Sequence, residues 1–224
     1  GGYRNMIGRH EVATITDTYM KGFRDFDIEK AYEAMKRNSK EATMLSRHIG
    51  KDWRLNELDK VYLEKGFYPA KPSDQPEWVK EVGFGRQSVA LTLENCYDDW
   101  CMSILAKELG KEDDYQYYLN RAYNYRNVFD SKSGFMRPKT ADGKWIEPFD
   151  PIWSGGQGGR DFYTENNGWN YTWYVLHDPQ GLINLMGGQE PFVAKLQQMF
   201  ETNVPLYKNC LLYTSPSPRD RSVS

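Results

Sequence analysis

The sequence predicts a mainly α-helical protein of about seven helices. Two observations support this prediction. Apolar side chains recur at three- and four-residue spacing along most of the chain, and Gly or Pro residues follow these segments. Residues 130–162 form the one expected irregular excursion. A sheet of four or more strands would contradict the prediction.

The first helix is expected over residues 11–23. Its apolar side chains recur at helical spacing: Val12, Ile15, Tyr19 and Phe23. Asp27 is expected to cap a second helix, because an aspartate side chain accepts hydrogen bonds from the free N–H groups of a helix start. A third helix is expected over residues 55–65, followed by Gly66, which suits the left-handed residue after a helix.

The clearest helix is expected over residues 86–109, with a broad apolar face and Gly110 after it. Its neighbours Asp98 and Asp99 point about 100° apart on a helix, so structural roles are favoured over joint binding of one ion. Cys96 and Cys101 also face different sides, which favours buried thiols over a disulfide.

Further helices are expected over residues 112–129 and around residues 192–200. The irregular stretch between them carries the turn signals Ser133-Gly134 and Asp142-Gly143, and its short pieces 135–138 and 144–146 could pair as a hairpin. A long segment of this kind that contains aromatic residues is typical of a functional loop.

Length and charge narrow the class of protein. A chain of 224 residues suffices for one domain with a core, and a net charge of −2 gives no electrostatic argument for binding nucleic acid. The mean hydropathy is −0.78, and no run approaches the roughly 20 apolar residues of a membrane span. No Cys or His spacing indicates zinc.

The stretch YTENNGWNYTWYVLHDPQGLINLMGG, residues 163–188, combines residue types that suit a sugar site. Aromatic faces stack on pyranose rings, amides bind hydroxyl groups, and a carboxyl group moves a proton. Thr164 is expected to cap a helix that carries the rings of Trp169, Tyr171 and Trp173, so that Glu165 lies where loop becomes helix. A buried aromatic helix with a glutamate near its cap is the alternative.

This stretch also resembles the signature of glycoside hydrolase family 92, the calcium-dependent, inverting exo-α-mannosidases. Residues 3–35, 88–115 and 124–151 resemble the same family in the same order. The family pattern usually has Gly, Asn and Ala after the glutamate, where this chain has Asn166, Asn167 and Gly168, and a Pro where it has Leu176.

The resemblance implies a partial (α/α)6 toroid built from antiparallel helical hairpins. It implies Glu165 as the general acid, and mannose-containing glycans as substrates. The residues expected to bind substrate are Tyr163, Trp169, Trp173, His177 and Asp178. It further implies an extracellular or periplasmic location. The general base and most ligands of a Ca²⁺ ion are expected downstream of Phe200, with no metal ligand assigned in this chain.

Residues 1–209 are therefore interpreted as an internal fragment of the catalytic domain, lacking N- and C-terminal parts and expected to be inactive alone. Residues 210–224 resemble translated sequencing adapter and are expected to be a non-native tail. Two alternatives stay open. One is a non-catalytic helical carbohydrate-binding or interaction module. The other is a different α/α-toroid enzyme, either a glycosidase or a polysaccharide lyase, for which Arg160 and Tyr163 are the nearby candidates.

Overall fold

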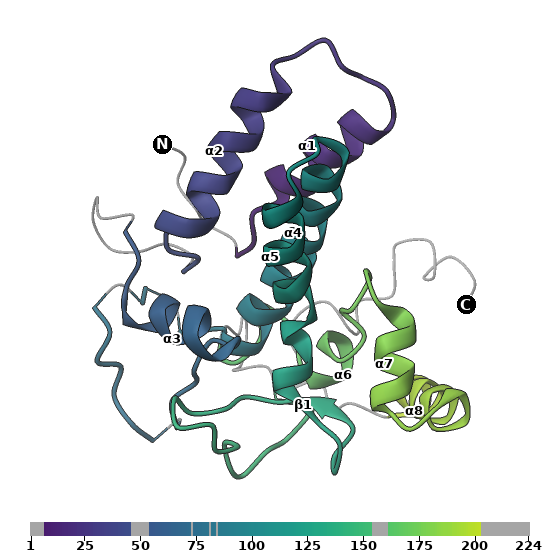
Figure 1. Ribbon diagram of the computed structural model, residues 1–224. Helices are drawn as coiled ribbons and strands as arrows, with labels where there is room; N and C mark the ends of the chain where they lie inside the picture. Colours follow the sequence, from purple (N-terminus) through teal and green to yellow (C-terminus); the bar gives the residue numbers. More distant parts are fainter. Residues whose placement is uncertain are drawn as a thin grey trace, which may run out of the picture.

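The computed structural model describes residues 7–45, 54–72, 74–80, 82–83, 85–153 and 161–202, and these form a mainly helical structure (Figure 1). The helices are α1 His10–Met20, α2 Ile28–Glu41, α3 Glu57–Lys65, α4 Ser88–Glu108, α5 Glu112–Ala122, α6 Gly168–Tyr171, α7 Pro179–Leu185 and α8 Gln189–Glu201, with a 3₁₀ helix η1, Tyr123–Val128. Within the described ranges the sheet has two antiparallel strands, β1 Phe129–Asp130 and β2 Phe135–Met136. The prediction of a mainly α-helical fold is confirmed.

The organising element is α4, which runs through the centre of the molecule beside α5 (Figure 1). Its side chains enter three separate apolar clusters. Val89 and Leu93 pack toward β2 and α7, Leu91 packs toward α3, and Met102 and Leu105 pack between α1, α2 and α5. A helix that is buried on several sides can position polar side chains deep inside a fold, because its backbone already satisfies its own hydrogen bonds.

Two predicted helix ends are confirmed by their local geometry. The Asp27 side chain accepts a hydrogen bond from the Lys30 N–H at 3.0 Å and so caps α2. Gly66 follows α3 with a φ of 73°, a left-handed conformation that glycine adopts at little cost. The helix predicted over residues 11–23 is shorter than expected, because α1 ends at Met20, and Phe23 beyond it is 68 % exposed.

The predicted helix over residues 112–129 is only partly correct. The α-helix ends at Ala122, continues as η1, and becomes β1 at Phe129. Phe129 is buried opposite Met136 in the two-stranded sheet. The pairing predicted between 135–138 and 144–146 forms at its outer end, where Ile146 N–H donates to the Pro138 carbonyl at 3.0 Å.

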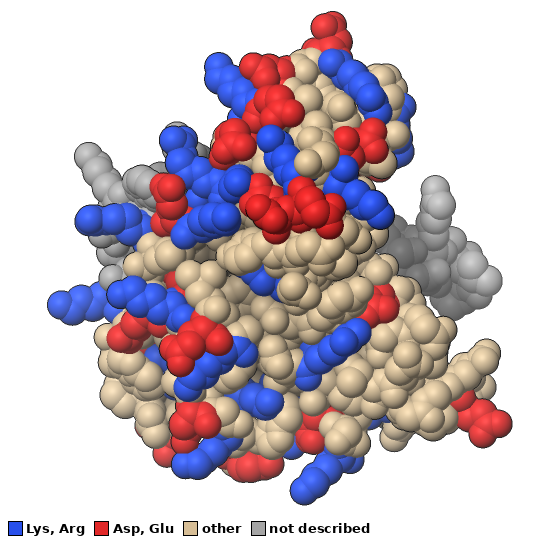
Figure 2. Space-filling view, in the orientation of Figure 1, with Lys and Arg blue, Asp and Glu red and all other residues tan. Residues whose placement is uncertain are grey.

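Other sequence predictions concern single residues and segments. Cys96 and Cys101 are free, buried thiols, as predicted. In the part of the chain that the structure describes, no helix is long and apolar enough to cross a membrane. On the face shown in Figure 2, basic and acidic side chains alternate over the upper part of the molecule, where α1 and α2 lie. The expected tail, residues 210–224, lies outside the described residues, as does Arg160.

Candidate active site

The segment that leads to Glu165 lies against the start of α4. Gln87 N–H donates to the Asp161 carbonyl at 2.8 Å, and Val89 N–H donates to the Phe162 carbonyl at 3.0 Å. The Thr164 hydroxyl donates to Gln87 Oε1 at 2.7 Å. These hydrogen bonds link residues that are more than seventy positions apart, and they place the 161–164 segment on the buried end of the central helix.

Thr164 is not the helix cap, which corrects the sequence prediction. The short helix α6 begins at Gly168, and the Asn167 side chain caps it by accepting from the Asn170 N–H at 3.3 Å. Glu165 therefore precedes the helix by three residues. It has a φ of 52°, a left-handed conformation that residues other than glycine seldom adopt. Strained backbone of this kind concentrates at active sites and ligand-binding turns.

Tyr163 and Tyr171 form a buried aromatic layer beside Glu165. Their rings stack at 5.6 Å with an interplanar angle of 28°. The Tyr163 hydroxyl donates to the Met136 carbonyl at 2.6 Å, and its side chain is fully buried. Gly168 allows this close packing, since a Cβ atom there would lie 3.0 Å from the Tyr163 hydroxyl. In this structure Tyr163 is thus a core residue.

The two predicted tryptophans do not share a helix, because α6 ends at Tyr171 and Trp173 lies in the following turn. Trp169 is 6 % exposed and meets the Phe135 ring edge-on at 4.7 Å. Trp173 meets Phe192 of α8 edge-on at 5.3 Å. Both indole N–H groups are buried without a hydrogen-bond partner among the described residues. The two indoles therefore join the apolar packing between the hairpin, α6 and α8.

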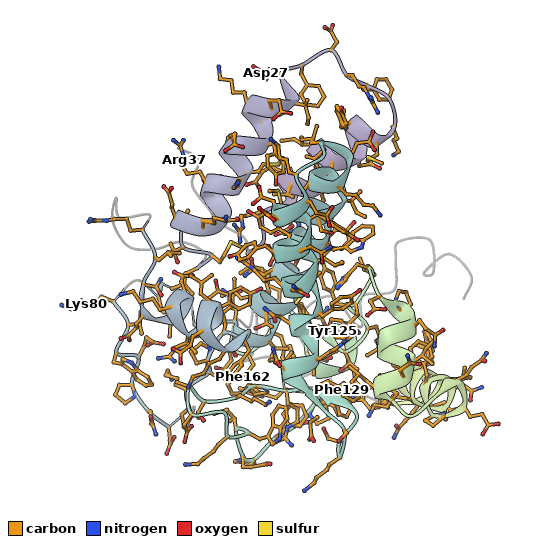
Figure 3. The ribbon with its side chains drawn as sticks, in the orientation of Figure 1. Asp27, Arg37, Lys80, Tyr125, Phe129 and Phe162 are labelled. Atoms are coloured by element: carbon orange, nitrogen blue, oxygen red, sulfur yellow. The ribbon has the colours of Figure 1, made fainter. Side chains whose placement is uncertain are left out.

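His177 and Asp178 lie close to η1. His177 Nε2 donates to the Ala122 carbonyl at 2.8 Å, and burial lowers the pKa of the imidazole, which favours its neutral form. The Asp178 carboxylate caps α7 by accepting from the Gly181 N–H at 2.9 Å, and it accepts from the Tyr125 hydroxyl at 2.7 Å. Figure 3 labels Tyr125 on η1, on the side of α7. Burial alone would raise the pKa of Asp178, but these hydrogen bonds and Arg126 hold it below its ordinary value.

Asp98 and Asp99 have different partners, as their helical divergence predicts. Asp98 Oδ2 accepts from the Arg9 backbone N–H at 2.6 Å, and burial raises the pKa of this carboxyl group to about 7. Asp99 Oδ2 lies 2.9 Å from Arg121 Nε in a buried ion pair. Within the described residues, no group of three or more His, Cys, Asp or Glu side chains could hold a metal ion.

Sequence reasoning did not single out Glu94. This residue is 7 % exposed on α4, and its Oε2 accepts from the Tyr174 hydroxyl at 2.8 Å. His10 Nε2 lies 3.5 Å from the same oxygen. Burial raises the pKa of the Glu94 carboxyl group, against the opposing effects of Tyr174 and His10. The signal in the sequence was a single charged residue inside the run VALTLENC, whose other residues are uncharged.

Most glycosidases act through a pair of Asp or Glu residues, and carboxyl groups whose pKa is shifted by burial, such as that of Glu94, cluster at functional sites. The family comparison agrees with this class. The family model "Glycosyl hydrolase family 92 catalytic domain" matches residues 2–214. The chain belongs to glycoside hydrolase family 92. This membership favours a glycosidase over the lyase and the binding-module alternatives.

Similar proteins of known structure support the fold. A family 92 α-mannosidase from Bacteroides thetaiotaomicron, solved in complex with mannoimidazole, is 37 % identical, with a TM-score of 0.73 over 89 % of this chain and 23 % of its own. A family 92 inverting mannosidase from Bacteroides thetaiotaomicron VPI-5482 is 36 % identical, with a TM-score of 0.70 over 88 % of this chain and 24 % of its own. The mainly helical fold matches these structures, and it is consistent with the predicted partial toroid.

A curated relative covers the chain to a similar extent. It is described as an uncharacterized secreted glycosidase of Arthroderma benhamiae, and it is 29 % identical over 88 % of this chain and 27 % of its own length. The chain thus spans about a quarter of the length of the proteins that it matches.

Proposed function

We propose that the whole protein is an inverting, exo-acting α-mannosidase that releases terminal mannose from α-mannosides of glycans, with Glu165 as the general acid. The observation that carries this proposal is the position of Glu165. It is the glutamate of the family motif, and it is held in a left-handed turn between the segment bound to α4 and the α6 helix. The similarity to mannosidases of known structure supports mannose as the sugar.

The chemistry assigned to Glu165 is proton donation to the oxygen of the leaving group. An inverting enzyme needs a second carboxylate about 6.5–9.5 Å away, which activates a water molecule on the opposite face of the sugar. We propose that this base lies downstream of Phe200. Glu165 has a left-handed backbone conformation, and a general acid must lie within hydrogen-bond reach of the oxygen that it protonates.

The calcium ion that the family resemblance implies is also part of the proposal. Because the described residues contain no suitable cluster, its ligands would come from other parts of the protein. We assign no catalytic step to it. The secreted relative supports an extracellular or periplasmic location for the protein.

The test is Glu165→Gln in the full-length protein, with Glu190→Gln on the exposed start of α8 as the control. The substitution at 165 keeps the shape of the side chain and removes its acidic proton. We expect hydrolysis of an unactivated α-mannobioside to fall by about 10²- to 10⁴-fold, the usual worth of general acid catalysis. The loss should be much smaller on an aryl mannoside whose leaving group needs no protonation.

Two readouts separate the parts of this proposal. Equal losses on both substrates would show that Glu165 is not the acid. NMR of the first-formed product should show β-mannose, the inverted anomer, and first-formed α-mannose would contradict inversion. If the wild-type protein releases no mannose from any α-mannoside, the proposed substrate is wrong.

A further inference from the structure

We infer that Glu94 and His10 form a second sugar contact in the same site as Glu165, a carboxylate–imidazole pair that binds a hydroxyl group of the substrate. This inference rests on the proposed function and deepens it. Three features of the described residues support it. They are the contacts that hold His10, the Glu94 oxygen that accepts no hydrogen bond from a described residue, and the tyrosines that join Glu94 to the Glu165 turn.

His10 is held in place by the residues before it. The Arg9 backbone N–H donates to Asp98 Oδ2 at 2.6 Å, and Arg9 Nη2 donates to Asn95 Oδ1 at 2.8 Å. Gly8 has a φ of 83°, and a Cβ atom there would lie 2.7 Å from His10 Cε1. The glycine therefore leaves the space that the imidazole occupies, and two polar residues of α4 fix the chain that carries it.

The pair is open on one side. The side chain of His10 is 55 % exposed, whereas that of Glu94 is 9 % exposed. Glu94 Oε2 accepts from the Tyr174 hydroxyl and faces His10 Nε2. No described residue donates a hydrogen bond to Glu94 Oε1. The Glu94 side chain is 9 % exposed, and Oε1 is not among the fully buried atoms that lack a partner, so this oxygen can accept from a ligand that supplies a donor, as a sugar hydroxyl does.

Tyr171 and Tyr174 connect this pair to the catalytic turn. Their rings lie 6.0 Å apart, and the Tyr171 hydroxyl lies 3.4 Å from the Thr164 carbonyl, directly before Glu165. Burial raises the pKa of Tyr171, and the charges of Glu94 and Glu165 both raise it further. The contacts that run from Glu94 through Tyr174 and Tyr171 to Thr164 therefore place the Glu94 pair beside the Glu165 turn.

A purely structural role is the competing explanation, in which Glu94 serves only to hold Tyr174. The two explanations differ in their dependence on the substrate. A residue that binds one hydroxyl group loses its importance when that hydroxyl is absent, whereas a structural residue affects all substrates alike. An analogue series therefore distinguishes them.

The experiment uses the full-length protein with Glu94→Gln, His10→Ala and the control Glu108→Gln, which changes an exposed glutamate at the far end of the same helix. Each variant is assayed on an aryl α-mannoside and on its four monodeoxy analogues. We expect Glu94→Gln to lower kcat/KM on the parent compound by about 10- to 100-fold, the worth of a hydrogen bond to a charged group. On the analogue that lacks the hydroxyl group bound by Glu94, the loss of kcat/KM caused by Glu94→Gln should shrink to roughly threefold or less.

The His10→Ala variant should single out the same hydroxyl or its neighbour, and Glu108→Gln should match the wild type on all substrates. Equal losses on every analogue, or no loss at all, would overturn the inference while leaving the mannosidase activity of the wild type intact. If Glu94→Gln does not fold, the His10→Ala series decides the question alone, because that side chain is exposed. If the wild type hydrolyses no mannoside, the proposed function fails and this inference fails with it.

Discussion

Replacing Asp178 with alanine should destabilise the protein by about 2–3 kcal/mol. Its carboxylate caps α7 through the Gly181 N–H, and loss of such a cap costs about 1 kcal/mol. The hydrogen bond from the Tyr125 hydroxyl, at 2.7 Å, joins a buried donor to a charged acceptor and contributes about 1.5 kcal/mol. Arg126 adds little, because half of its side chain is exposed and its contact is 3.4 Å long.

The matched control is Asp27→Ala. Asp27 caps α2 through the Lys30 N–H and is exposed, so its loss should cost only the capping contribution of about 1 kcal/mol. Guanidinium unfolding at pH 7 measures both variants. A double-mutant cycle of Asp178→Ala with Tyr125→Phe should show a coupling of about 1 kcal/mol. Equal costs for the two aspartates, or additive behaviour of Asp178 and Tyr125, would refute this reasoning.

The same variant should change the dependence of stability on pH. The folded-state pKa of Asp178 is lowered, so the unfolded chain binds its proton first as the pH falls. Its contribution is therefore complete above the unfolded pKa of about 3.9 and is lost below it. The stability difference between wild type and Asp178→Ala should narrow as the pH falls below about 3.9. If instead Asp178 only contacts substrate, the variant should lose activity and keep its stability.

Two further substitutions test neighbouring positions. Gly181→Ala should destabilise the protein by about 1–3 kcal/mol, because the new methyl group would meet the Asp178 and Tyr125 side chains. Alanine is normally the better helix residue, so a gain of stability in guanidinium unfolding would contradict this expectation. His177→Phe should cost about 1–2 kcal/mol at pH 7.5, since it leaves the Ala122 carbonyl unpaired. Burial lowers the folded-state pKa of His177, so the wild type should lose stability as the pH falls below about 6.5. The His177→Phe variant should lack this pH-dependent loss. Parallel pH profiles of the unfolding midpoint for the two proteins would contradict the buried, neutral state of His177.

The sequence by itself determined the features that depend on near neighbours along the chain. Helical spacing of apolar residues predicted α2, α4 and α8, the capping residue Asp27 marked the start of α2, and Gly66 marked the end of α3. A cap or a left-handed turn involves atoms within four residues, so its physical cause is visible in a short stretch of sequence. The family resemblance was equally readable, and the match over residues 2–214 confirms it.

Tertiary structure decided the end of α5 and the surroundings of the motif. The chain leaves the α-helix at Ala122, continues as η1, and then pairs Phe129 with Met136, a partner that helical spacing cannot reveal. Thr164 bonds Gln87 instead of capping a helix, although threonine is a good cap. The preference of threonine for a helix cap is worth about 1 kcal/mol of stability, so a buried hydrogen bond to a residue far along the chain can override it.

The same principle governs the candidate active site. Glu94 is one of many glutamates in the sequence, and what distinguishes it is burial on α4 against Tyr174, eighty positions away. The motif residue His177 is likewise bound to the carbonyl of Ala122, fifty-five positions away. Desolvation and hydrogen-bond partners set the chemistry of a titratable group, and both are properties of the packed fold, because they depend on atoms that only folding brings together.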